Sequence, residues 1–198
     1  MDVSAFTVTA AYDAHLPVGA LSVKAAVRAS ASTISEPGVE VSLRLWTPRG
    51  ATVAVLREIS PATRDLRDRA VRLDDRTVEY PAGCWVDGIR DYELAVALPA
   101  RGAGDEMLAA RLDLTAEGEV VAGAQIAVTW AADAESAGIV DESAVAGGVA
   151  VEELSTGLSP RPRHMLVLDE SAAGEPCLGC GLRAAAGDRF CERCGRRL

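Results

Sequence analysis

Apolar and polar residues alternate with a period of two over residues 1–130. The clearest stretch is residues 21–30, where every second side chain is apolar and most of those between are polar. A strand with one buried and one solvated face has this pattern. The same alternation predicts strands over residues 6–12, 39–45, 53–55, 70–79, 92–98, 108–114 and 122–130.

Turn sequences between these segments suggest which strands pair. Thr47-Pro48-Arg49-Gly50 separates 39–45 from 53–55, and we predict a hairpin there. Thr115-Ala116-Glu117-Gly118-Glu119 separates the last two segments and predicts a second hairpin. Residues 61–69 are a charged turn without an apolar stripe. Short strands at regular spacing without long helices predict an all-β fold, an antiparallel β-sandwich over residues 1–130.

The composition changes after Trp130. Residues 131–160 contain no lysine, arginine or aromatic residue, but six acidic residues. We interpret residues 131–176 as an acidic linker, with a short helix near 149–154. Met165-Leu166-Val167-Leu168 predicts one late strand, which pairs with a free sheet edge or lies over one.

Four of the five cysteines form two CxxCG motifs close to residue 198: Cys177, Cys180, Cys191 and Cys194. Zn²⁺ in structural sites takes four soft donors in a tetrahedron, and a CxxC turn brings two thiolates to one ion. We therefore predict one structural Zn²⁺ in a small ribbon over residues 177–198. Four thiolates leave no open coordination position, so no metal catalysis is expected. The alternatives are a reduced tail without metal or two redox dithiols, and no βαβ context favours the latter.

This tail, with Phe190 before the second motif, resembles the zinc-ribbon modules attached to many bacterial regulatory proteins. Their pattern is CxxCG, about ten residues, then FCxxCG. The resemblance implies a structural or protein-binding role for residues 177–198.

Residues 1–130 resemble, more loosely, the β-sandwich region of bacterial von Willebrand factor A (vWA) domain proteins. The matching patches are 6–27 with His15-Leu16-Pro17, 43–51, 79–85, 90–92 and 106–111. Between Ser30 and Val39, where such proteins carry the A domain, this chain has a loop of about eight residues, and no DxSxS motif occurs. The resemblance implies a stand-alone sandwich working in vWA-associated signalling or assembly systems.

The formal net charge is −9, which argues against a nucleic-acid or anionic-membrane binder acting through the whole chain. Residues 177–198 are the exception, because five arginines against two acidic residues give them +3. No targeting signal is recognised, and no run approaches the roughly 18 apolar residues of a spanning helix. We expect a cytoplasmic protein, in which clustered cysteines indicate metal rather than disulfides.

No nucleophile and base stand out as a pair, and we predict no catalytic residue. His15 and His164 are expected at the surface, and Cys84 as a half-buried structural thiol beside a turn at residues 80–83. The acidic residues Asp74, Asp75, Asp87, Asp91 and Glu93 are interpreted as solvated charge rather than a calcium site. Gly102-Ala103-Gly104 does not fit a phosphate loop. Trp46, Trp85 and Trp130 are expected in the core or at a sheet edge, with a peptide-binding face as the alternative.

These features predict a non-catalytic protein-interaction or adaptor protein, with the sandwich and the tethered ribbon as two contact points. We expect protein partners and no small-molecule substrate. The alternative is a nucleic-acid or ribosome-associated regulator that binds through the ribbon arginines. A further hypothesis is that Glu152 and Glu153 of the linker dock on the ribbon and inhibit it.

Overall fold

The computed structural model describes residues 5–32, 38–132, 173–185 and 187–198. In these ranges the chain is almost entirely β-strand, with a 3-10 turn at Arg67–Arg69 and no α-helix. The predicted all-β fold class is confirmed. None of the described elements is a helix long and apolar enough to cross a membrane. The linker helix near 149–154, the late strand at 165–168, His164, Glu152 and Glu153 lie outside the described residues.

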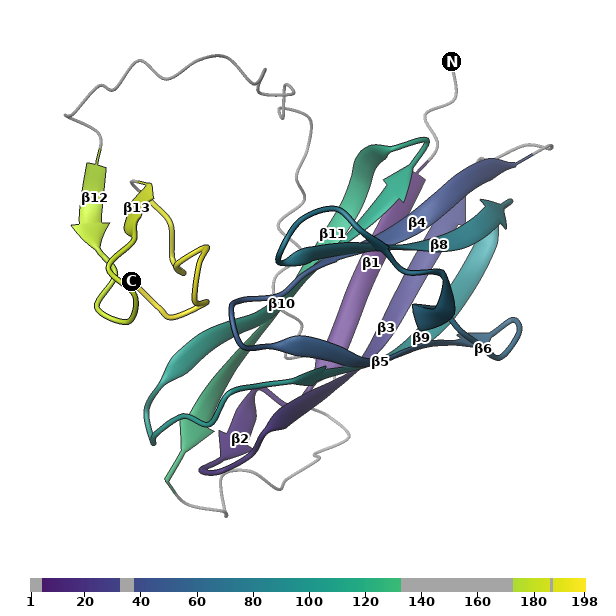
Figure 1. Cartoon of the computed structure of the whole chain (residues 1–198). Helices are drawn as coiled ribbons and strands as arrows, with labels where there is room; N and C mark the ends of the chain where they lie inside the picture. Colours follow the sequence, from purple (N-terminus) through teal and green to yellow (C-terminus); the bar gives the residue numbers. More distant parts are fainter. Residues whose placement is uncertain (1–4, 33–37, 133–172, 186) are drawn as a thin grey trace.

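Two sheets face each other and enclose the core (Figure 1). The first has the order β1 (Ala5–Tyr12), β3 (Ser22–Ser32), β9 (Gly88–Ala97), β5 (Thr52–Ser60) and β6 (Arg64–Asp65). The second has the order β2 (His15–Pro17), β11 (Glu119–Ala131), β10 (Glu106–Ala116), β4 (Val39–Trp46), β8 (Thr77–Trp85) and β7 (Val71–Arg72). Pairing in both sheets is antiparallel, apart from β2 against β11.

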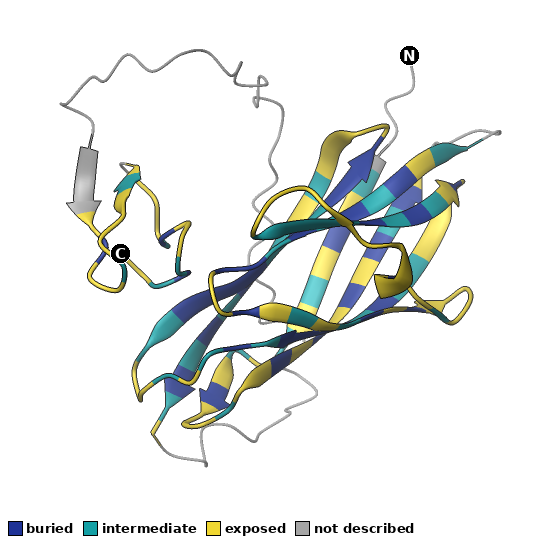
Figure 2. Ribbon diagram, viewed as in Figure 1, coloured by how far each residue is buried: buried dark blue, intermediate teal, exposed yellow. Residues whose placement is uncertain are grey.

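The period-two pattern of the sequence becomes the inner face of each sheet. Along β3, Val23, Ala25, Val27 and Ala29 are buried, while the residues between them are exposed (Figure 2). Residues of β4, β10 and β11 contribute the facing layer, with Trp130 fully buried. Burial of these apolar side chains is the main source of stability of such a sandwich.

The predicted hairpin of residues 39–45 and 53–55 is wrong. β4 pairs with β8 and β10 in one sheet, and β5 pairs with β9 and β6 in the other. The intervening turn, in which the Ala51 N–H donates to the Pro48 carbonyl, carries the chain from one sheet to the other. Alternation of apolar and polar residues shows which face of a strand is buried. It does not show the strand's partner, because strands in two facing sheets have the same alternation as the two strands of a hairpin.

The second predicted hairpin is confirmed, because β10 and β11 pair along most of their length. The predicted strand over 70–79 is instead divided between β7 and β8 by a turn at Asp74-Asp75. The expected turn at residues 80–83 is also wrong, since β8 continues to Trp85. A bulge after Pro81 accommodates this proline, which has no N–H for the sheet.

Candidate metal centre and its contact with the sandwich

The four predicted metal ligands meet at one point. The Sγ atoms of Cys177, Cys180, Cys191 and Cys194 all lie within 4.8 Å of one another. The Cys177 and Cys194 sulfurs are 3.6 Å apart, and those of Cys180 and Cys191 are 3.5 Å apart. Four sulfurs at the zinc–thiolate bond length occupy corners of a tetrahedron about 3.8 Å apart. The donor set and its spacing therefore fit a single metal ion.

Each CxxCG motif folds as a tight turn that directs two thiols inward. The N–H groups of Cys180 and Gly181 donate to the Cys177 carbonyl, and the Gly195 N–H donates to the Cys191 carbonyl. The two glycines after the motifs have φ values of 72° and 71°, in the left-handed region that favours glycine. The glycine of CxxCG is therefore required by the backbone of both turns.

The surroundings of the thiols shift their pKa values in opposite directions. Burial raises the pKa of Cys194 to about 12. Burial also opposes ionisation of Cys177, but hydrogen bonds, including one from the Gly179 N–H, lower the pKa of this thiol to about 7. A bound divalent cation favours the thiolate form of all four groups.

A small hairpin accompanies the cysteines. β12 (Ala173–Pro176) pairs with β13 (Arg183–Ala185), so these four residues of the predicted linker belong to the ribbon sheet. Within the described part of the ribbon, the buried residues are Cys177, Cys191 and Gly195. The described part of this small unit has almost no apolar core, so a metal ion held by the four thiols would supply the stability that a core supplies elsewhere.

The ribbon rests on the sandwich through its second knuckle. Arg196 forms an antiparallel bridge with Met107 of β10. The Leu108 N–H donates to the Gly195 carbonyl (2.8 Å), and the Arg49 N–H donates to the Arg193 carbonyl (3.1 Å). Arg76, at the start of β8, also donates to the Glu192 carbonyl. The ribbon thus adds to the sheet edge beside the end of β4.

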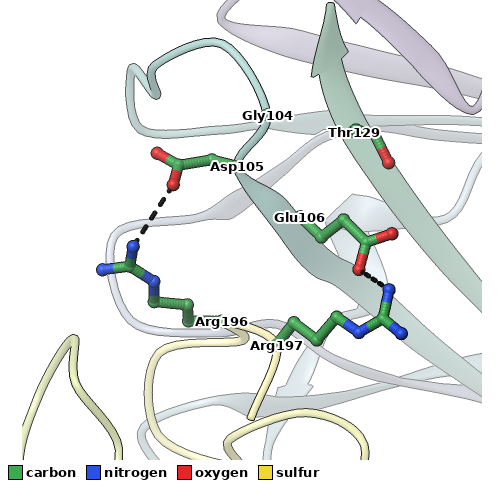
Figure 3. A pocket seen from close by; sticks show the side chains of 6 residues that line it. All are labelled: Gly104, Asp105, Glu106, Thr129, Arg196 and Arg197. Atoms are coloured by element: carbon green, nitrogen blue, oxygen red, sulfur yellow. Dashed lines mark hydrogen bonds and ion pairs between the residues drawn. The ribbon is translucent and has the colours of Figure 1, made fainter.

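Two ion pairs flank this contact (Figure 3). Arg196 pairs with Asp105 at 3.4 Å, and Arg197 pairs with Glu106. The four side chains, with Gly104 and Thr129, line an open cavity of about 410 Å³. The cavity is polar, and its charges are already paired with one another.

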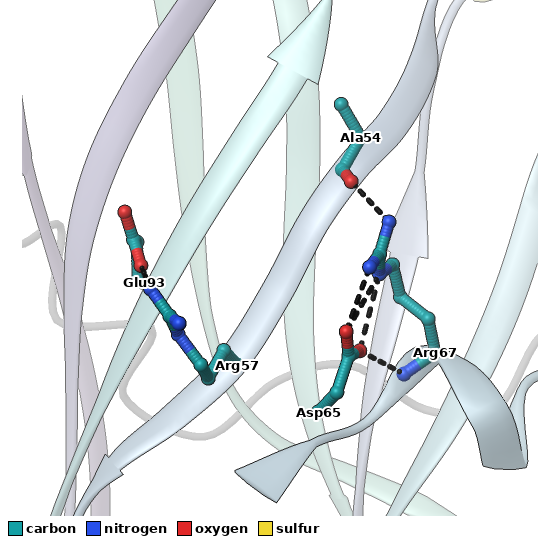
Figure 4. Close-up of polar contacts among 5 residues, drawn as sticks. All are labelled: Ala54, Arg57, Asp65, Arg67 and Glu93. Carbon is teal, nitrogen blue, oxygen red and sulfur yellow. Dashed lines mark hydrogen bonds and ion pairs between the residues drawn. The ribbon is translucent and has the colours of Figure 1, made fainter. Parts of the chain in front are cut away.

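Three of the five acidic residues considered for calcium have structural roles. Asp74 accepts hydrogen bonds from the N–H groups of Arg76 and Thr77, of which the first mainly lowers its pKa. Asp91 pairs with Arg28 at 2.7 Å, and Glu93 pairs with Arg57 (Figure 4). Asp74 therefore closes a turn, and the other two join neighbouring strands of the first sheet. Asp75 and Asp87 are exposed.

Figure 4 also shows how the edge of the first sheet is fastened. Arg67 holds Asp65 with its side chain at 2.7 Å and donates to the Ala54 carbonyl. These contacts attach the short strand β6 to β5 and are structural.

Among the described residues, the remaining candidates do not come together in one site, although Trp46 lines an open hollow with Arg76 and Glu192 beside the ribbon contact. His15 is exposed on β2, where its backbone N–H donates to the Asp13 carboxylate. Cys84 is exposed on β8, which corrects the expectation of a half-buried thiol beside a turn. Trp85 and Trp130 are buried in the core, and Trp46 is partly buried beneath Arg111.

One buried charged cluster was not anticipated. Glu58 is only 2% exposed, pairs with Arg64 and lies 3.9 Å from Arg90 Nε. Both arginines also donate to the carbonyl of Ala82, the extra residue at the β8 bulge. The cluster joins the two sheets. Its only sequence signal is that Glu58 has the same alternation phase as Leu56.

The docking surface of the ribbon was also not anticipated. Its residues, Asp105–Leu108, Pro48, Arg49 and Arg76, are far from the cysteines in sequence. The contact places a second requirement on Gly195, because a Cβ there would lie 2.6 Å from the Leu108 carbonyl oxygen and 3.0 Å from Pro48. A Cβ at Gly181 would have nothing within 4 Å. In the sequence, both glycines are accounted for by the turn of the CxxCG motif. The need for glycine at the contact with the sandwich therefore could not be predicted from the sequence.

A search against protein-family models and a search of curated proteins gave no match. Among solved structures, the chain is similar to a von Willebrand factor type A protein from Catenulispora acidiphila, with 30% identity and a TM-score of 0.48. That match covers 50% of this chain and 25% of the other, so the chain spans about a quarter of that protein.

Cohesin modules are also similar in structure. One, from a Clostridium perfringens family 33 glycoside hydrolase, has 10% identity and a TM-score of 0.38, covering 66% of this chain and all of the module. A non-cellulosomal cohesin from Archaeoglobus fulgidus has 11% identity and a TM-score of 0.35, covering 64% of this chain and 91% of the other. With TM-scores below 0.5, these similarities carry no inference about function.

Proposed function

We propose that the protein is a non-catalytic protein-interaction or adaptor protein, in which a ribbon with one structural Zn²⁺ is attached to a β-sandwich. The observation that carries the proposal is the cluster of four Sγ atoms within 4.8 Å of one another. Thiolates favour Zn²⁺ over hard cations, and four of them leave no position for a substrate. The metal would act as the core of the ribbon.

The charged residues of the sandwich support the non-catalytic part of the proposal. Five carboxylates described above each form an ion pair with an arginine: Glu58, Asp91, Glu93, Asp105 and Glu106. A carboxylate held in this way stabilises the fold and is poorly placed to exchange protons with a substrate. Work in a vWA-associated signalling or assembly system is part of this proposal, and rests on the sequence resemblance of residues 1–130.

The nucleic-acid alternative stays a prediction with less support. Arg196 and Arg197 face Asp105 and Glu106, which removes two of the five ribbon arginines from a phosphate-binding surface. Arg183, Arg189 and Arg193 are exposed. RNA or DNA binding that weakens steeply with added salt, and that is lost when these three become glutamine, would restore this alternative.

The test of the proposed function joins partner capture to metal analysis. The full chain and its Cys180→Ser variant are used as bait, and zinc is measured in the same samples. We expect one zinc per intact chain and a partner set that changes when the ribbon ligand is lost. Substrate turnover by the purified chain, or identical partners with and without zinc, would contradict the proposal.

A further inference from the structure

The sheet edge beneath the ribbon is a segment of β10 that β4 does not reach. β4 pairs with β10 from Arg111 to Ala116, and the preceding residues Glu106–Leu108 extend past the end of β4. Uncovered N–H and C=O groups of such an edge bind other extended segments. Here Gly195–Arg197 occupies it, through the Leu108 N–H to the Gly195 carbonyl and the Arg197 N–H to the Glu106 carbonyl (3.4 Å).

Three features of the occupied edge select the segment that binds there. Opposite Leu108 it leaves no room for a side chain, because a Cβ on Gly195 would lie 2.6 Å from the Leu108 carbonyl oxygen. At the next two positions Asp105 and Glu106 receive Arg196 and Arg197 (Figure 3). The edge therefore fits a segment in which a left-handed glycine precedes two arginines that pair along the edge, and it disfavours acidic segments.

The occupying segment takes its shape from the metal knuckle. The Gly195 N–H donates to the Cys191 carbonyl, and the Cys191 N–H donates to the Arg196 carbonyl. The backbone that docks is thus hydrogen-bonded to a metal-ligand residue and follows directly after Cys194. Loss of the metal removes the fixed left-handed turn at Gly195, for which φ is 71°.

We propose that Asp105–Leu108 is a docking edge for a basic, glycine-containing extended segment of a partner protein, and that the metal-loaded ribbon competes for it within the same chain. The inference rests on the proposed function and names its surface, its partner chemistry and its regulation. The tether keeps the ribbon segment beside the edge at high effective concentration, and the metal holds that segment in its docked shape. When the ribbon loses its metal, the segment is no longer preorganised, and a partner segment can displace it.

The two knuckle glycines supply a matched pair of variants. Gly181→Ala and Gly195→Ala impose the same left-handed strain, at φ 72° and 71°. Only the second also introduces a clash with the sandwich. In zinc-loaded full chains with equal metal content, Gly195→Ala should speed hydrogen exchange of the Leu108 amide at least about tenfold over Gly181→Ala. Amides of β10 that face β4 should be unchanged. Equal exchange of Leu108 in both variants would overturn the competition.

The binding arm uses a synthetic peptide of residues 189–198 with serine at both cysteine positions. A control peptide carries glutamate at the positions of Arg196 and Arg197. The Leu108 amide resonance of the Gly195→Ala chain should shift at a peptide concentration at least about tenfold lower than that of the wild type. The control peptide should cause no shift.

Equal responses to the two peptides, or no response, would overturn the docking edge. A dimer that forms by exchange of ribbons between copies would also overturn it, because the occupant is then a second copy. The proposed function would survive these results. It fails separately, if the chain binds no metal or no partner.

Discussion

At Glu58 the sandwich buries a negative charge and compensates it with two arginines, of which Arg90 is itself largely buried. Removing one member of a buried ion pair leaves the other charges without compensation. We predict that Glu58→Gln lowers the free energy of unfolding by about 3 kcal/mol. Glu93→Gln, which removes a partner of Arg57 on the outer face, should cause a much smaller change in the same urea titration. Equal effects would contradict a buried structural role for Glu58.

Tyr92 links the same region to stability at high pH. Burial, with the nearby Glu58, raises the pKa of Tyr92 from 10.0 to about 12. The contribution of Tyr92 to stability is therefore fully present below about pH 10 and is lost as the pH rises from about 10 to about 12, because Tyr92 ionises first in the unfolded chain. Burial raises the pKa of Tyr80 in the same direction.

Tyr92→Phe should therefore reduce the alkaline loss of stability without abolishing it. Among the described residues, the Tyr92 hydroxyl has no well-formed hydrogen bond, and its contact with Arg90 only partly offsets the rise of its pKa. Removal of the hydroxyl should therefore cost little stability at neutral pH. Denaturant unfolding at pH 7 and pH 11 measures both effects. An undiminished loss at pH 11 in the variant would show that Tyr92 is not its source.

At the scale of elements, the sequence predicted the strands better than their partners. Alternation identified β3 because Val23, Ala25 and Val27 face inward together. It could not place β4 and β5, since strands in facing sheets bury alternate residues as hairpin strands do. It also ended β8 too early, because Pro81 and Gly83 signal a turn unless a bulge accommodates them.

The ribbon should behave as an element that folds with its metal. We predict that a chelator removes hydrogen-exchange protection from the β12–β13 hairpin. It should also unfold the backbone around Arg183 and Arg189, whose side chains are already exposed, so that trypsin cleaves there. The core strands should keep their protection, because the apolar cluster of the sandwich contains no ribbon residue. Mass spectrometry of the exchanged peptides measures both regions. The Leu108 amide, which donates to the ribbon, should lose protection with the metal. Simultaneous loss of protection at the β10 amides that face β4, or in β11, would contradict this independence.

At the scale of the whole molecule, the meeting of the four cysteines could be predicted and its setting could not. Each CxxCG motif places two thiols close together by the geometry of a single turn, so the four sulfurs can be identified from the sequence. The contact of Gly195–Arg197 with β10 joins residues about 90 positions apart along the chain. Such a contact depends on which edge the completed sheet leaves uncovered, and no periodic pattern records it.

Native mass spectrometry of the full purified chain, with its thiols counted in parallel, tests the central claim most directly. We predict one zinc ion per chain and four thiols protected from alkylation until a chelator is added. The zinc should be lost in Cys180→Ser and retained in Cys84→Ser, because Cys84 lies on β8 outside the four-sulfur cluster. A chain without metal, or with these sulfurs joined as disulfides, would contradict the account.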